Sequence, residues 1–136
     1  MRVFLAGASG AIGRRLVPLL VEAGHTVTGM TRTASKAEML RGAGAQPVVA
    51  DALDAGAVIA AIKTARPEVV IHELTAIPAR LDIRRFDREF EITNLLRTKG
   101  TDNLLAGARA AGARRFVAQS YAAWPYARQG GAIKTE

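Results

Sequence analysis

A glycine-rich turn near the start of the chain joins a short apolar run to a segment with helical periodicity. The apolar run covers residues 3–6, and the turn carries Gly7, Gly10 and Gly13. A strand, a turn of this kind and a helix form the context of a dinucleotide-binding loop. Gly7 then allows the tight turn, Gly10 leaves room for a pyrophosphate, and Gly13 lets the helix pack closely on the sheet.

The spacing of these glycines is wider than usual, because two residues rather than one separate Gly7 from Gly10. A longer turn is therefore expected. The free N–H groups at the start of the following helix are predicted to face the phosphates. The alternative is that the glycines serve only the steric needs of the turn. No Gly-x-x-x-x-Gly-Lys-Ser/Thr run occurs, so a mononucleotide loop of that type is excluded.

Five short apolar runs alternate along the chain with Ala- and Leu-rich segments of helical period. This alternation is typical of βαβ units and predicts an α/β fold with a Rossmann-type, doubly wound parallel sheet. Pro47 in the third run is tolerated at a sheet edge, which agrees with the strand order 3-2-1-4-5. The predicted strands cover residues 2–6, 25–30, 46–50, 69–72 and 115–119.

Four helices are predicted between these strands, over residues 11–23, from Ser35, over 53–64 and over 84–111. The second is expected to start with the capping box Ser35-Lys36-Ala37-Glu38. Pro18 is expected to bend the first helix or to remove one of its backbone hydrogen bonds. The first helix is expected to bury its apolar residues Ile12, Leu16, Leu19 and Leu20.

The composition excludes several kinds of site. The chain has no Cys, and its two His are isolated in sequence, so disulfides and a cysteine nucleophile are excluded and no metal site is expected. No apolar stretch is long enough to cross a bilayer, and the N-terminus lacks a signal-peptide pattern. We therefore expect a cytoplasmic protein without a membrane partner.

The formal net charge of +7 raises nucleic-acid binding as a rival class. The basic residues are spread along the chain with acidic neighbours, and no nucleic-acid module is recognised. We therefore expect no nucleic-acid partner, and a basic field also suits a phosphorylated ligand. The oligomeric state is left open by the sequence, a homo-oligomer included.

The strand and helix pattern stops after Gln119. The 136 residues suit one domain, but a complete fold of this type needs at least one further strand. We expect an incomplete NAD(P)-binding lobe over residues 1–126 and a polar tail over 127–136 that leads to an absent substrate-binding part. The C-terminal part of the fold is accordingly expected to be missing.

The segment after the second strand bears on the choice of cofactor. NAD sites place an acidic residue there, whereas NADP sites place a cation for the 2′-phosphate. No acidic residue lies between Glu22 and Glu38, and Arg32 offers a planar fork of donors. NADP(H) is therefore preferred, with NAD(H) as the alternative. Ser35 either adds a hydroxyl bond to the cofactor or caps the next helix.

Asp51 and Asp54 follow the third strand. Asp51 lies where the carboxyl end of the strand faces a ligand crevice, and its carboxylate can accept from the exocyclic amine of adenine. The competing interpretation makes Asp51 or Asp54 the cap of the following helix. The sequence leaves both interpretations open.

Several segments together resemble the N-terminal half of the NAD-dependent epimerase/dehydratase family, within the extended short-chain dehydrogenase/reductase superfamily. The resemblance spans almost the whole chain, and the glycine loop and residues 100–120 are its most specific parts. It implies a Rossmann lobe that carries NAD(P). The implied contacts are Gly7, Ser9, Gly10, Ala11 and Ile12 around the pyrophosphate, and Asp51 with Ala52 or Leu53 at the adenine. The segments that carry this resemblance are the glycine triplet and residues 51–54, 70–72, 100–105 and 115–120.

The chain departs from the family pattern at the expected catalytic residues. Family members have a Ser or Thr after the fifth strand, and further on a Tyr with a Lys four residues later. Neither Tyr121 nor Tyr126 has such a Lys, so the dyad is absent and the chain is expected to be inactive alone. Alignment of residues 116–117 puts Tyr121 at the hydroxyl position and leaves Ser120 one position early. Ser120 and Tyr121 are the catalytic candidates.

A second departure follows the fourth strand. Family members tend to have small residues there, against which the nicotinamide side of the cofactor rests, but this chain has His72-Glu73-Leu74. Glu73 either contacts substrate or finds a backbone N–H or an arginine partner. His72 is interpreted as a packed strand residue.

The leading hypothesis is the NADP-binding lobe of an oxidoreductase or epimerase that acts on a small hydroxyl or carbonyl compound, with hydride transfer performed by the cofactor. A non-catalytic NADP sensor with the same fold is the alternative. A Tyr and a Lys four apart in downstream sequence would favour the enzyme.

Overall fold

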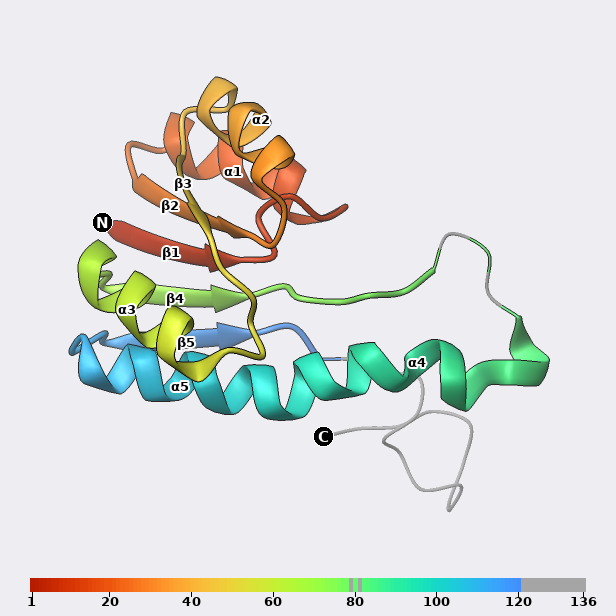
Figure 1. Ribbon diagram of the computed structural model, residues 1–136. Helices are drawn as coiled ribbons and strands as arrows, with labels where there is room; N and C mark the ends of the chain where they lie inside the picture. Colours follow the sequence, from red (N-terminus) through yellow and green to blue (C-terminus); the bar gives the residue numbers. More distant parts are fainter. Residues whose placement is uncertain (79, 81, 121–136) are drawn as a thin grey trace, which may run out of the picture.

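The computed structural model describes residues 1–120 except 79 and 81. At its centre lies a parallel sheet of five strands in the order β3-β2-β1-β4-β5 (Figure 1). This confirms the predicted fold class and strand order, and Pro47 lies on an edge strand as expected. The predicted boundary at residue 126 and the tail beyond it fall outside the described residues. The strands are β1 Arg2–Ala6, β2 Thr26–Thr31, β3 Gln46–Val49, β4 Val69–His72 and β5 Arg115–Ala118.

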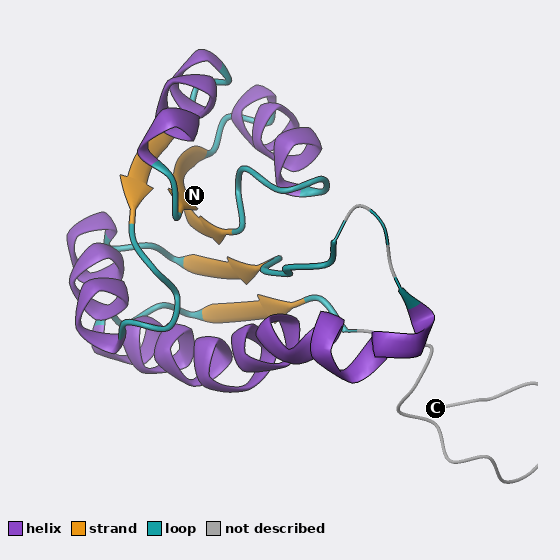
Figure 2. Ribbon diagram, turned by 45° about the vertical axis from the view of Figure 1, so that its right-hand side comes forward, coloured by secondary structure: helices purple, strands orange, loops and turns teal. Residues whose placement is uncertain are grey.

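Helices cover both faces of the sheet (Figure 2). Helices α1 and α2 lie on one side, and α3 and α5 lie on the other (Figures 1 and 2). In the described part of the chain, no helix has the length and apolar character needed to cross a membrane. The helices are α1 Gly13–Glu22, α2 Ala37–Gly42, α3 Ala55–Ala65, α4 Phe86–Leu95 and α5 Thr101–Ala110, with short 3-10 helices η1 Ala34–Lys36 and η2 Ile83–Arg85.

The side-chain alternation of β1 divides the core into two layers. Phe4 and Ala6 point toward α3 and α5, whereas Leu5 packs with Val17 of α1 and with Leu40 of α2. All of these side chains are buried. A central strand that is covered on both faces needs an unbroken apolar run, which residues 3–6 supply.

The last helical segment differs from the single regular helix predicted over residues 84–111. Helices α4 and α5 are joined by one π-helical turn, η3 Leu96–Gly100, and together they form a rod whose α4 end extends past the sheet (Figure 1). Side chains form hydrogen bonds with backbone carbonyl groups of this turn. Thr101 Oγ1 donates to Arg97 O at 2.6 Å, and His72 Nε2 lies 3.3 Å from Leu96 O.

Two local predictions were wrong. Ile12 and Leu19 are 45% and 61% exposed, because α1 turns the face that carries Gly13 and Val17 toward the sheet. Ser35 caps no helix, since η1 begins at Ala34 and Ser35 already lies inside a helical turn. Helix α1 contains Pro18 and begins without a side-chain cap.

Candidate functional site

A cleft of about 490 Å³ opens along the carboxyl ends of the strands. Such a volume falls within the range of small-molecule and cofactor sites. The cleft crosses the junction of β1 and β4, where the strand order reverses direction, and this is the usual place for a ligand in a doubly wound sheet. Its polar and glycine-loop lining includes Gly7, Ser9, Gly10, Thr31, Arg32, Thr33, Lys36, Asp51, Glu73, Thr75 and Gln119.

The three glycines of the first loop have distinct structural roles. Gly7 adopts φ +89°, and a Cβ there would lie 2.7 Å from the carbonyl oxygen of Glu73. A Cβ on Gly13 would overlap the carbonyl oxygen of Gly7 and lie 2.6 Å from the carbonyl carbon of Ala8. Gly10 is exposed at the cleft, and a Cβ there would meet only Gly7 O, at 3.2 Å. Gly7 and Gly13 therefore hold the loop against the sheet, and Gly10 leaves its surface bare.

The start of α1 supplies hydrogen-bond donors to the cleft. Gly10 N donates to Gly7 O at 2.9 Å, and Arg14 N donates to Gly10 O at 3.0 Å. Between them, the backbone N–H groups of Ala11 and Ile12 make no hydrogen bond with another described residue. Unused donors at the positive end of a helix dipole form an anion site, so the loop fits a pyrophosphate.

Ser9 and Thr31 join the glycine loop to the end of β2. Their hydroxyl oxygens lie 3.0 Å apart, and Thr33 N donates to Thr31 Oγ1 at 3.3 Å. Thr31 is buried, whereas Arg32 and Lys36 are exposed along the cleft. Ser35 lies outside the cleft lining. The structure therefore brings Ser9, Arg32 and Lys36 to one cleft and leaves Ser35 on the exposed surface of η1.

At the end of β3 the two aspartates have different partners. Asp54 Oδ1 accepts from Ala57 N at 3.0 Å and caps α3. Asp51 Oδ1 accepts from Leu53 N at 3.0 Å, while Asp51 and Ala52 line the cleft. The open alternative is thus resolved in favour of Asp54 as the helix cap. Leu53 packs toward the core and lies outside the cleft lining.

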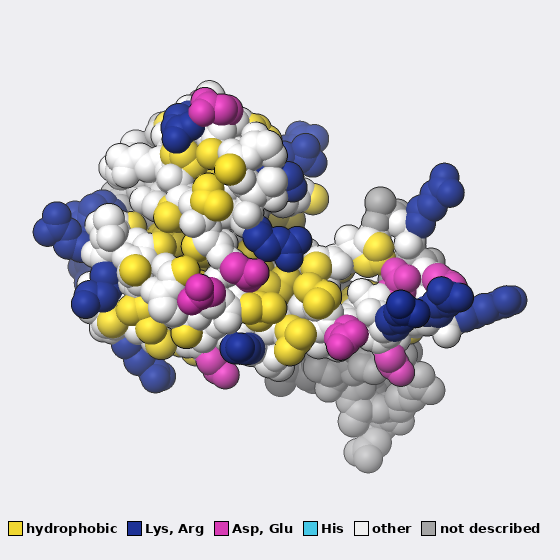
Figure 3. Space-filling view, in the orientation of Figure 1, with side chains coloured by type: hydrophobic (Ala, Val, Ile, Leu, Met, Phe, Trp, Pro, Cys, Tyr) yellow, Lys and Arg dark blue, Asp and Glu magenta, His cyan; other side chains and the backbone are white. Residues whose placement is uncertain are grey.

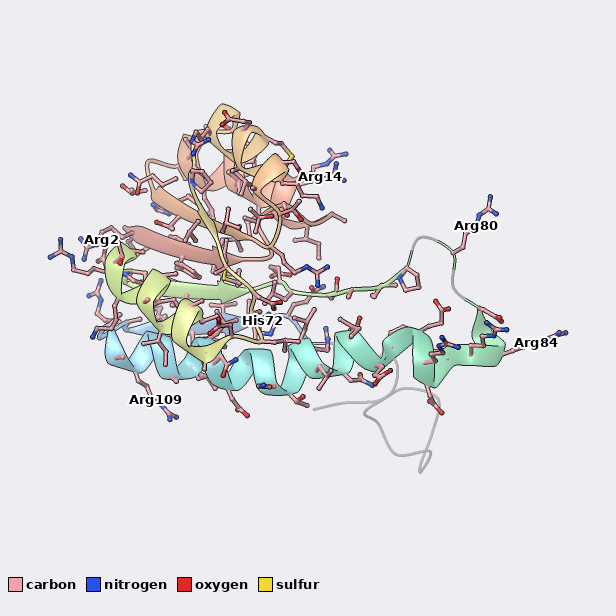
Figure 4. The ribbon with its side chains drawn as sticks, in the orientation of Figure 1. Arg2, Arg14, His72, Arg80, Arg84 and Arg109 are labelled. Atoms are coloured by element: carbon pink, nitrogen blue, oxygen red, sulfur yellow. The ribbon has the colours of Figure 1, made fainter. Side chains whose placement is uncertain are left out.

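His72 at the end of β4 is buried and lies against the π-helical turn (Figure 4). Leu74 N donates to His72 Nδ1 at 3.1 Å, so the ring proton resides on Nε2. Nε2 lies 3.3 Å from Leu96 O and 3.0 Å from Thr101 Oγ1, which both accept from it. Burial lowers the pKa of His72, the Leu96 carbonyl raises it in part, and the positive charge of Arg97 lowers it further.

A family model described as NAD(P)H-binding matches residues 7–132. The chain belongs to this family. The chain is therefore an NAD(P)-binding domain, and the matched segment from 7 to 132 includes every cleft-lining residue.

Relatives of this NAD(P)-binding domain and solved structures similar to it carry reductase and epimerase names. A 3-diazoavenalumate denitrifying reductase from a Streptomyces species is 51% identical over 90% of the chain, and the chain spans 38% of that relative's length. Yeast methylglyoxal/isovaleraldehyde reductase Gre2, solved with NADPH, is 27% identical with a TM-score of 0.68, over 87% of this chain and 36% of its own. A putative epimerase from Burkholderia cenocepacia is 28% identical with a TM-score of 0.70, over 89% of this chain and 37% of its own.

The catalytic candidates of the NAD(P)-binding domain are only partly described. Ser120 is exposed, directly after Gln119, whose N–H donates to His72 O at 3.1 Å. Gln119, rather than Ser120, lines the cleft. Tyr121 and Tyr126 lie outside the described residues. Within the described part, no group of three or more acidic or His side chains could hold a metal ion.

Asn103 is a site-positioning residue that sequence reasoning missed. Its buried side chain on α5 donates from Nδ2 to Ala52 O at 2.9 Å, across 51 positions of sequence. This bond holds the loop after β3 against α5. A polar residue at a buried position of a predicted helix was the available signal, but its acceptor is a backbone atom that no sequence pattern identifies.

The two aspartate roles predict different responses to mutation. Asp54→Ala is expected to lower the free energy of unfolding by about 1 kcal/mol, because α3 loses its N-cap bond. Cofactor affinity should stay at the wild-type value, since Asp54 lies outside the cleft lining. Urea unfolding and a cofactor titration check the two expectations. A loss of affinity without a loss of stability would contradict the capping role.

Proposed function

We propose that the protein binds NADP(H) in preference to NAD(H) and forms the cofactor lobe of an oxidoreductase or epimerase that acts on a small hydroxyl or carbonyl substrate. When bound, the cofactor would supply or accept the hydride at the nicotinamide ring. The chain's own residues bind and orient it: the glycine loop takes the pyrophosphate, and the loop of Asp51 and Ala52 takes the adenine.

The observation that carries the NADP preference is the position of Arg32. It follows β2 directly, lines the cleft, and makes no ion pair with another described residue. Lys36 adds a second positive charge along the same wall. The segment between Glu22 and Glu38 has no carboxylate that would bond the ribose hydroxyls and repel a phosphate. A planar guanidinium suits the 2′-phosphate of NADP.

The distribution of charge supports a small phosphorylated ligand over a nucleic acid. Figure 3 shows Lys and Arg side chains spread from the sheet region to the far end of α4, with Asp and Glu side chains among them. A nucleic-acid surface gathers its positive charge into one patch or stripe. The cations at the cleft instead lie on one wall of it, where Arg32 and Lys36 are exposed.

Arg32→Ala tests the cofactor preference. Wild-type protein should bind NADPH more tightly than NADH, and the variant should lose about 10-fold to 100-fold in NADPH affinity because a charge-assisted interaction is removed. NADH affinity should stay unchanged within error. Fluorescence titration with both reduced cofactors measures all four constants.

The matched control is Arg109→Ala. Arg109 is exposed on α5 and points away from the cleft (Figure 4). The Arg109→Ala substitution removes the same charge from the chain as Arg32→Ala. It therefore separates the effect of a local contact with the cofactor from the effect of the net positive charge. Equal affinities of the wild-type protein for NADPH and NADH would overturn the preference, and so would equal losses in both arginine variants.

A further inference from the structure

Glu73 lines the cleft, and one oxygen of its carboxyl group has no hydrogen-bond partner among the described residues. The side chain as a whole is half-buried, but its Oε2 atom is buried and makes no hydrogen bond with any described residue. Burial raises the pKa of this carboxyl, and the positive charge of Arg97 on η3 lowers it in part. A buried polar atom without a partner costs free energy, so its retention in a cleft points to a ligand group that satisfies it.

The backbone of Glu73 is fixed against the glycine loop. Glu73 N donates to Ala6 O at 2.9 Å, and Gly7 is so close that a Cβ would lie 2.7 Å from Glu73 O. The residue follows β4 directly, next to β1, so it lies at the point where the strand order reverses. Glu73 therefore lines the cleft beside the glycine loop.

The sheet order separates Glu73 from the wall that carries Arg32. The residues after β2 and β3 line one half of the cleft, and the residues after β4 and β5 line the other. A dinucleotide that places its 2′-phosphate near Arg32 and its pyrophosphate on the glycine loop extends its nicotinamide nucleoside into the half with Glu73. The other ionisable side chains of the cleft, Arg32, Lys36 and Asp51, lie in the first half.

We propose that Glu73 is a ligand-binding residue that recognises the nicotinamide group of the cofactor, through a hydrogen bond between its carboxyl group and the carboxamide N–H. This inference rests on the proposed cofactor function and goes beyond it. The oxidised nicotinamide ring carries a positive charge that the reduced ring lacks. An ionised Glu73 therefore favours the oxidised cofactor over the reduced one.

Two substitutions and three ligands test the proposal. Glu73→Leu removes the hydrogen bond, and Glu73→Gln keeps the shape and hydrogen-bonding capacity but removes the charge. The ligands are NADP⁺, NADPH and 2′-phospho-ADP-ribose, which lacks the nicotinamide group and its ring charge. Glu91→Gln, at an exposed carboxylate on α4 outside the cleft lining, is the matched control. Thermal unfolding without ligand verifies that each variant is folded.

Glu73→Leu is expected to weaken NADP⁺ binding about 10-fold, the effect of losing one hydrogen bond to a charged group. Binding of 2′-phospho-ADP-ribose should change by a smaller factor. Glu73→Gln should weaken NADP⁺ more than NADPH. In the wild-type protein, the ratio of NADP⁺ to NADPH affinity should rise with pH because Glu73 loses its proton in that direction, and its raised pKa places this change above the ordinary range of a glutamate. The ratio should be flat over the same range in Glu73→Gln.

The outcomes separate this inference from the proposed function. If the wild-type protein binds none of the three ligands, the cofactor function itself fails. If all three bind and Glu73→Leu binds them like the wild type, only the role of Glu73 is overturned. Equal losses for all three ligands in Glu73→Leu would also overturn it, because they would indicate a structural effect on the glycine loop.

Discussion

Replacement of Gly13 by alanine is expected to abolish detectable cofactor binding and to lower the free energy of unfolding by about 3 kcal/mol. The new Cβ would overlap Gly7 O and lie 2.6 Å from the carbonyl carbon of Ala8, and both are backbone atoms that cannot rotate away. Either α1 moves off the sheet or the loop changes its course. Both movements would displace the N–H groups that are proposed to bind the pyrophosphate.

Gly42→Ala is the control for this prediction. Gly42 ends α2, and a Cβ there would meet nothing within 4 Å. The control should bind cofactor like the wild type and unfold at an equal or slightly higher denaturant concentration, since alanine is the better helix former. Urea unfolding and NADPH titration measure both variants. Wild-type affinity in Gly13→Ala would contradict the role assigned to this close contact.

Replacement of His72 by leucine is expected to cost about 3 kcal/mol, through unsatisfied buried hydrogen-bonding groups at both ends of the ring. Leu74 N would lose its acceptor, and Leu96 O and Thr101 Oγ1 would lose their donor. Those groups lie in the loop after β4 and in the π-helical turn. His72 therefore ties the loop beside the cleft to the long helical rod.

The same residue predicts a pH dependence of stability. The pKa of His72 is lowered in the folded protein, mainly by burial, so the unfolded chain binds the proton more readily. Its contribution is fully present above the unfolded pKa of about 6.5 and is lost as the pH falls through the lower, folded pKa. Protonation of Nδ1 would also set a proton against the N–H of Leu74.

Urea unfolding between neutral and mildly acidic pH measures this dependence. The wild-type free energy of unfolding should fall with decreasing pH, and His72→Leu should lack that component. His25→Gln removes the other histidine of the chain and should retain the wild-type slope. If the pH dependence persists in His72→Leu but disappears in His25→Gln, the prediction for His72 is contradicted.

The local sequence pattern was sufficient for the parts of the fold that repeat. An unbroken apolar run such as residues 3–6 indicates a strand buried on both faces, and the βαβ alternation restricts the topology to a few possibilities. Pro47 then marked an edge strand. The glycine loop was recognisable because its function depends on the absence of side chains, and that absence is visible in the sequence itself.

The sequence was less informative wherever the partner of a polar group depends on the exact course of the backbone. Ser35 has the spacing of a helix cap, but a 3-10 helix begins one residue earlier, so Ser35 lies inside that helix and does not precede it. The sequence left open whether Asp51 contacts adenine or whether Asp51 or Asp54 caps the next helix, and in the structure Asp54 accepts from Ala57 N. Asn103 was missed because its acceptor, Ala52 O, belongs to the backbone of another element.

The glycine-rich turn, the edge strand with Pro47 and the cations after β2 could all be inferred from the order of the amino acids, because each depends on residue type within a few positions. The unpartnered carboxyl of Glu73 and the neutral ring of His72 could not. Both depend on which groups approach across the β1–β4 junction and from the π-helical turn. Burial and hydrogen bonding between distant segments exist only once the chain is folded.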